Sequence, residues 1–184
     1  MNKELMLSLV DKVIKIDRGG PESRVGKVLA AEEDHLTVLT EDEGVIYYNT
    51  QHIKSLSDNA KQGLKFELEI PEDFEFVRAQ DFKSVCDSLK YHWIKVNRGG
   101  PESLEGVLDD VNDDFMVVVS NEEIVRLSMF HVRNISYGVK VEKQEADKSE
   151  NKSSNDDEKT ANKSEESNKE NTNKYQKDIT IQNQ

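Results

Sequence analysis

The chain has 184 residues and a net charge of −12 at pH 7, with 34% charged and 35% hydrophobic residues. This length allows one or two domains. Residues 1–140 contain 17 Lys and Arg against 26 Asp and Glu, a net charge of −9, and residues 141–184 carry −3. Because both parts are acidic, neither has the basic surface by which proteins bind nucleic acid or anionic membranes.

A hexapeptide, Arg-Gly-Gly-Pro-Glu-Ser, occurs twice, at residues 18–23 and 98–103. Each copy follows a short apolar run and is followed three residues later by another glycine, Gly26 or Gly106. The likeness continues, at a spacing of 80 and then 79 positions, through two more pairs of segments: 35–39 with 115–119 and 52–57 with 131–136. The chain is therefore predicted to hold two copies of one module of about 50 residues.

The first copy has the pattern of a short helix followed by five strands. Apolar residues at helical spacing predict a helix over residues 3–11, and residues 50–52 are long enough for one helical turn. Alternation and β-forming residues predict the strands: residues 13–17, 23–31, 35–40, 45–49 and 53–56. This order is typical of small Sm-like barrels.

Glycines shape the turns of this module. Gly19 is expected to take a positive φ, while Gly20 should be extended because Pro21 follows it. Gly26 lies inside a predicted strand, where its missing side chain permits a sharp bend.

The second copy repeats the plan, with a helix over Ala79–Lys90 and strands between Trp93 and Ser136. Between the copies, strict alternation predicts a strand over Leu64–Ile70 and a turn at Pro71. A single module of this size buries only about 60% of its chain surface and is marginally stable, so the two modules are expected to pack together. From Glu142 onward apolar residues almost disappear, which predicts a disordered, charged tail.

The expected fold is therefore mostly β: two tandem Sm-like barrels with a disordered tail. The predicted divisions follow the chain: 1–58 first helix-plus-barrel module, 59–78 connecting strand and turn, 79–140 second helix-plus-barrel module, and 141–184 tail.

The repeated hexapeptide is the candidate interaction site. Geometry explains its glycines and proline, but the flanking polar residues recur unchanged although the neighbouring strands have diverged. The candidate residues of the two loops are Arg18, Gly19, Gly20, Pro21, Glu22 and Ser23, with Arg98, Gly99, Gly100, Pro101, Glu102 and Ser103. Two interpretations remain open: a hairpin turn closed by an exposed Arg18–Glu22 ion pair, or a surface recognition loop.

No other pattern indicates catalysis, a cofactor or a metal. His52 and His131 occupy matched positions without cysteine or carboxylate companions at ligand spacing. The acidic turns, including residues 41–43, are expected to be solvated hairpin tips. A single cysteine, Cys86, excludes an internal disulfide and is interpreted as a buried thiol, with an intermolecular crosslink as the alternative. The N-terminus has no apolar run resembling a signal peptide or membrane span, so synthesis in the cytoplasm is expected.

Several of these features together resemble the spore coat protein B (CotB) family of endospore-forming bacteria. They are the two hexapeptides after a strand, the segments 45–48 and 52–56, and the hydrophilic tail rich in Ser and Lys. The resemblance covers residues 5–140. It implies a non-enzymatic component of the outer spore coat, made in the mother cell and assembled through other coat proteins.

The tail departs from the family pattern, because it is short and mildly acidic and lacks the basic serine repeats that a coat kinase phosphorylates. Phosphorylation is therefore doubtful at its candidate serines: Ser153, Ser154, Ser164 and Ser167. A homo-oligomer is a further possibility. The rival functions are an Sm-like RNA-binding protein, which the net charge of −9 disfavours, and a small hydrolase or sugar-binding module, for which no paired carboxylates are found.

Overall fold

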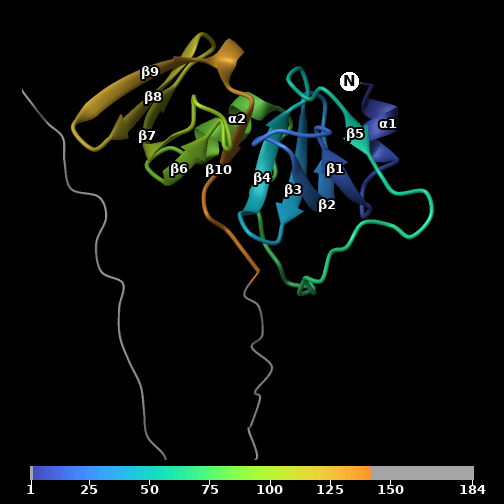
Figure 1. The fold of residues 1–184 in the computed structure, drawn as a ribbon. Helices are drawn as coiled ribbons and strands as arrows, with labels where there is room; N and C mark the ends of the chain where they lie inside the picture. Colours follow the sequence, from blue (N-terminus) through green and yellow to red (C-terminus); the bar gives the residue numbers. More distant parts are fainter. Residues whose placement is uncertain (1, 142–184) are drawn as a thin grey trace, which may run out of the picture. The chain divides into compact units, whose positions relative to one another are not determined.

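A computed structural model describes residues 2–141, which contain two short helices, a 3-10 turn and ten strands (Figure 1). The elements of the first half are α1 (Lys3–Leu7), β1 (Val13–Ile16), β2 (Arg24–Ala31), β3 (His35–Thr40), β4 (Gly44–Asn49) and β5 (Leu56–Ser57). Those of the second half are α2 (Phe82–Ser88), β6 (Trp93–Val96), β7 (Leu104–Val111), β8 (Phe115–Ser120), β9 (Glu123–Ser128), η1 (Met129–His131) and β10 (Asn134–Ser136). No helix in this range is long and apolar enough to cross a membrane.

The ten strands form one antiparallel sheet in the order β5-β1-β2-β3-β4-β10-β6-β7-β8-β9. The first five positions and the last five have the same internal order, because the last strand of each half pairs with the first strand of that half. The two halves join where β10 pairs with β4, placing Asn134 opposite Tyr48 and Ile135 opposite Tyr47. The predicted contact between the modules is thus a continuous strand ladder.

The prediction of two separate barrels is not confirmed, because the sheet is single and does not close on itself within the described residues. The physical reason lies at the junction. The backbone groups along one edge of each half are satisfied by the other half, through the β4–β10 pairing and through a hydrogen bond from Val45 N to Val139 O (2.9 Å).

Both halves bend at the same two places in their second strand. Gly26 and Gly106 lie so close to the neighbouring strand that an added Cβ would be 2.4 Å from Leu39 O and 2.3 Å from Val119 O, respectively. Each strand also has a register shift shortly afterwards, between Val28 and Ala30 in β2 and at the matching point of β7. A glycine followed by a bulge increases the local bend of a strand, as the sequence predicted for Gly26.

The core is shared between the halves through β4, whose side chains alternate between two clusters. Ile46 and Tyr48 pack with β1, β2 and β3 in a cluster of the first half alone. Val45 and Tyr47 point the other way, into a larger cluster that contains α2 and the second-half strands. Because β4 is buried on both faces, the two halves form one packed body.

The predicted strand at Leu64–Ile70 is wrong, since this segment joins no ladder. Its alternation is nevertheless real: Phe66, Leu68 and Ile70 are partly buried against the larger cluster, and the residues between them are exposed. Because the segment pairs with no strand of the described sheet, the period of two reflects the packing of every second side chain against the larger cluster. The predicted turn at Pro71 is present, with Phe74 N donating to Pro71 O (3.1 Å).

The predicted helices are present but shorter than expected. Asp81 caps α2 by accepting a hydrogen bond from Ser84 N (2.7 Å), and the helix buries Phe82, Val85 and Cys86. Burial raises the pKa of the Cys86 thiol to about 12. Residues 142–184, which hold nearly all of the predicted tail and its four candidate serines, lie outside the described residues.

Candidate interaction loops at the junction of the two halves

The first hexapeptide loop is tied to the end of its own half by Asp17. This residue has a positive φ of 54°, and its Oδ1 accepts hydrogen bonds from Lys54 N (3.0 Å) and Ser55 N (3.3 Å). Ser23 closes the loop, because its Oγ donates to Asp17 O (2.6 Å) and its N–H to Gly20 O (3.2 Å). The side chain that precedes the hexapeptide therefore fixes the loop beside β5.

The second loop uses Asn97 in the same way. Asn97 also has a positive φ (53°), and its Oδ1 accepts from Arg133 N (2.8 Å) while its Nδ2 donates to His131 O (3.0 Å). Ser103 N donates to Gly100 O (3.2 Å), as its counterpart does in the first loop. Both loops are thus anchored to the segment before the last strand of their half.

The two identical hexapeptides differ in which glycine has the positive φ. It is Gly20 in the first loop and Gly99 in the second, each at 86°. The prediction of a positive φ at Gly19 and an extended Gly20 is therefore wrong for the first loop. The loops have different surroundings: a Cβ added at Gly99 would lie 2.1 Å from Pro21 O of the first loop, whereas a Cβ added at Gly19 would meet nothing within 4 Å.

Glu22 forms ion pairs that the sequence did not predict. The expected partner, Arg18, is not bonded to it; instead Arg133 Nη1 contacts Glu22 Oε1 across the junction, and Lys54 Nζ lies 3.4 Å from Oε2. The Glu22 side chain is only 18% exposed. The loop is the hairpin connection between the antiparallel strands β1 and β2, as one interpretation expected, but the Arg18–Glu22 ion pair is wrong. Glu22 instead connects the first half to the second.

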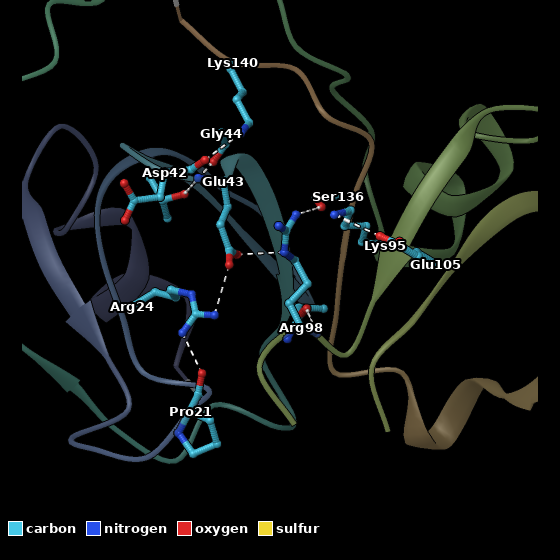
Figure 2. Close-up of polar contacts among 12 residues, drawn as sticks. Pro21, Arg24, Asp42, Glu43, Gly44, Lys95, Arg98, Glu105, Ser136 and Lys140 are labelled. Carbon is cyan, nitrogen blue, oxygen red and sulfur yellow. Dashed lines mark hydrogen bonds and ion pairs between the residues drawn. The ribbon is translucent and has the colours of Figure 1, made fainter. Parts of the chain in front are cut away.

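A second polar cluster crosses the junction around Glu43 (Figure 2). Its Oε1 lies 3.0 Å from Arg24 Nη2 and its Oε2 lies 2.7 Å from Arg98 Nε. Arg98 Nη1 also donates to Ser136 Oγ (2.6 Å) on β10, and Arg24 Nη1 donates to Pro21 O (2.6 Å) in the first loop. Residues 41–43 were predicted to be a solvated tip, but Glu43 is a largely buried link between two arginines.

Sequence reasoning missed this cluster because its members lie far apart in the chain and, of its three charged residues, only Arg98 belongs to the repeated motif. A usable signal was present, since an arginine at position 24 replaces the leucine found at the matching position, Leu104. An arginine in place of a leucine at a partly buried strand position favours a carboxylate partner, and Glu43 is the partner that Arg24 has.

The loops differ in what they expose. In the first loop Arg18, Gly19, Gly20 and Pro21 are exposed, whereas Glu22 is held at the junction. In the second loop the exposed residues are Pro101, Glu102 and Ser103, whereas the Arg98 side chain is only 14% exposed. Each copy of the motif therefore gives one charged residue to the junction and leaves its other charged residue at the surface.

The remaining candidates fall into structural positions. His52 lies edge-on to Phe130 (5.9 Å between ring centroids), and Phe130 lies edge-on to His131 (5.1 Å). Among the described residues no group of three or more His, Cys, Asp or Glu side chains could hold a metal ion. Tyr47 donates its hydroxyl to Val77 O (2.9 Å), and burial raises its pKa above the usual value.

Comparison with known proteins gives one informative match. The chain is 37% identical over 132 residues, or 72% of its length, to spore coat protein B of Bacillus subtilis (strain 168). Over this stretch the chain belongs to the spore coat protein B family.

The chain spans about a third of the length of this coat protein (34%). No family model matches the chain, and no solved structure matches it either. The membership expected from the repeated hexapeptides is confirmed, and the similarity suggests a component of the spore coat.

Proposed function

We propose that this protein is a non-enzymatic structural component of the outer spore coat that assembles through protein–protein contacts. The observation that carries the proposal is the 37% identity to spore coat protein B. In an endospore former, such a protein would be synthesised in the mother-cell cytoplasm and deposited on the developing spore, with other coat proteins as partners.

The exposed parts of the two loops are the proposed docking residues for those partners. Arg18 and Glu102 are both exposed, carry opposite charges and lie on the same motif in different halves. Loops that are already held by hydrogen bonds lose less conformational entropy on binding, which favours their use as contact sites. The acidic net charge favours basic partner surfaces.

The test is localisation and capture of the full chain. Immunogold labelling of intact spores should place the protein in the outer coat, and the purified chain should retain proteins from a coat extract. Labelling confined to the mother-cell cytoplasm or the spore core would contradict the coat assignment.

The role of the loops needs its own comparison. A variant with Arg18→Ala and Glu102→Ala should deposit less protein on spores than wild type, while a control with Glu72→Ala and Lys65→Ala, two exposed connector residues, should deposit normally. Equal deposition of both variants would remove the loops from the proposal and leave the coat role standing.

An Sm-like RNA-binding protein is the alternative. In each half the fifth strand pairs with the first, which gives the orders β5-β1-β2-β3-β4 and β10-β6-β7-β8-β9. The net charge of −9 over residues 1–140 opposes phosphate binding. Filter binding of single-stranded RNA at low salt separates the two functions: retention of RNA would favour the alternative, and its absence would remove it.

A further inference from the structure

The two halves of the sheet are joined by one strand pair, and the strands equivalent to that pair lie unpaired at the two edges of the sheet. Matching the halves by their strands equates β4 with β9 and β5 with β10. Inside the molecule the joint is made by β4 and β10. Within the described residues, β9 and β5 are the two edge strands. We propose that copies of this chain associate head to tail, with β9 of one copy pairing with β5 of the next.

Each half has a groove beside its hexapeptide loop. In the first half this groove is filled by Arg133 and Asn134, the segment of the second half that leads into β10, and in the second half the groove is open. The filled groove leaves a cavity of about 10 Å³. The corresponding groove beside the second loop is a solvent-open hollow of about 520 Å³, which His52 of the first half also lines. The matched lining residues are Asp17 with Asn97, Glu22 with Glu102, and Tyr48 with Leu127.

The segment that matches Arg133 and Asn134 is Lys54 and Ser55, which lies beside the free β5 edge. The Lys54 side chain is 72% exposed, and its ammonium can leave its long, solvent-exposed pair with Glu22 Oε2 (3.4 Å) to reach a second molecule. Placing it in the open groove would set its ammonium against Glu102, as Arg133 is set against Glu22 at the internal joint. The proposed contact between two molecules would thus pair a positive side chain with a negative one, as the contact between the two halves does.

Two more contacts of the internal joint have charge-complementary counterparts at the free edges. The pair formed by Glu43 and Arg98 corresponds to Glu122, the residue before β9, and the exposed Arg18. The stacked rings of Tyr47 and Tyr137 (6.2 Å between centroids) correspond to Arg126 and Asp58, two exposed residues of opposite charge. All three matched pairs therefore bring unlike charges together, which favours this pairing over like edges meeting.

The free β9 edge also exposes apolar surface that its counterpart buries. Ile124 is 60% exposed, whereas the matching Val45 is fully buried beside β10 and the second-half core. An edge strand with unpaired N–H and C=O groups and an exposed isoleucine is a template for strand addition. A second copy would cover Ile124 as the second half covers Val45.

Head-to-tail contacts of this kind either close into a ring or continue as a filament. For the purified full chain, sedimentation velocity at low ionic strength should show masses above that of the monomer, increasing with concentration. Added salt should reduce them, because the paired charges are screened. A wild-type chain that stays monomeric from micromolar to millimolar concentration would overturn the proposal.

Charge reversal at one predicted contact supplies the specific test. Arg126→Asp and Asp58→Arg should each be monomeric where the wild type assembles, whereas an equimolar mixture of the two variants should assemble again. Glu72→Arg, the same kind of reversal in the exposed connector, should behave as wild type. Circular dichroism and thermal melting of each variant show that it is folded.

Assembly of either single variant as in the wild type, or a mixture that remains monomeric, would overturn the β9–β5 contact. The experiment uses no coat material and does not depend on the proposed coat role. Its outcome is therefore separate from the localisation test above.

Discussion

Arg98 and Glu43 join the two halves of the sheet through a largely buried ion pair. Arg98 Nε lies 2.7 Å from Glu43 Oε2, and the two side chains are 14% and 20% exposed. Arg24 contacts the other carboxylate oxygen, so one acidic residue holds two arginines (Figure 2). The junction therefore depends on Glu43 remaining charged and in place.

Glu43→Gln should lower the free energy of unfolding by about 2 kcal/mol, because it leaves two partly buried guanidinium groups without a carboxylate. The matched control is Glu105→Gln, which breaks the Lys95–Glu105 pair (2.9 Å) between two side chains that are about half exposed. That control should cost less than about 1 kcal/mol. Urea denaturation of both variants measures the difference, and equal losses would contradict a special role for Glu43.

Gly99→Ala and Gly19→Ala make the same change at the same position of the two identical hexapeptides. The alanine at 99 would place its Cβ 2.1 Å from Pro21 O at a φ of 86°, so we expect a loss of about 2 kcal/mol or more. The alanine at 19 meets nothing within 4 Å and should change stability by less than about 0.5 kcal/mol. Thermal melting checks both, and a reversed order would mean that the loops do not touch as described.

How far the sequence predicts this molecule is shown by the same hexapeptide. The succession of one helix and five strands along each half follows from β-forming residues and turns, and it agrees with the structure, as does the close backbone approach expected at Gly26. The choice between Gly19 and Gly20 was not, because the copies differ in what packs against them, which no local pattern contains. The position of Glu43 was missed for the same reason: its partners Arg24 and Arg98 come from distant strands.

The single sheet shows a second limit of sequence reasoning. A repeat predicts two similar units, but whether their edges close individually or pair with each other depends on β4 meeting β10. The segment with Phe66, Leu68 and Ile70 shows the opposite error: its side chains alternate between buried and exposed, as in a strand, but its backbone pairs with no strand. A period of two in the hydrophobic residues therefore predicts which side chains are buried, but it does not predict whether the backbone pairs with another strand.

The cap of α2 should make stability depend on pH through Asp81. The hydrogen bonds from Ser84, chiefly its backbone N–H, hold the pKa of the Asp81 carboxyl below its usual value of 3.8. A group with a lowered folded-state pKa stabilises the fold above its unfolded pKa, and this contribution is lost as the pH falls below about 4 toward the folded-state value.

Asp81→Ala should therefore cost about 1 kcal/mol at pH 7, and the difference from wild type should shrink as the pH falls through this window. Asp81→Asn keeps an acceptor oxygen for the cap and should lose less at neutral pH. Urea denaturation at pH 7 and at pH 3 tests both variants. A gap between wild type and Asp81→Ala that is the same at both values would show that the charge of the cap is irrelevant.

Cys86 should be unreactive in the folded protein. Its side chain is fully buried in the larger cluster, and burial raises the pKa of the thiol to about 12, so almost no thiolate exists at pH 8. We expect a disulfide reagent to label the native chain at least about a thousandfold more slowly than the chain in denaturant. Labelling should then require opening of the core, so its rate should rise about tenfold for each 1.4 kcal/mol of lost stability. The thiol of the Glu43→Gln variant should accordingly be labelled faster than that of Glu105→Gln. Complete labelling of the native wild type within seconds would instead place the thiol at the surface and make an intermolecular crosslink through Cys86 feasible.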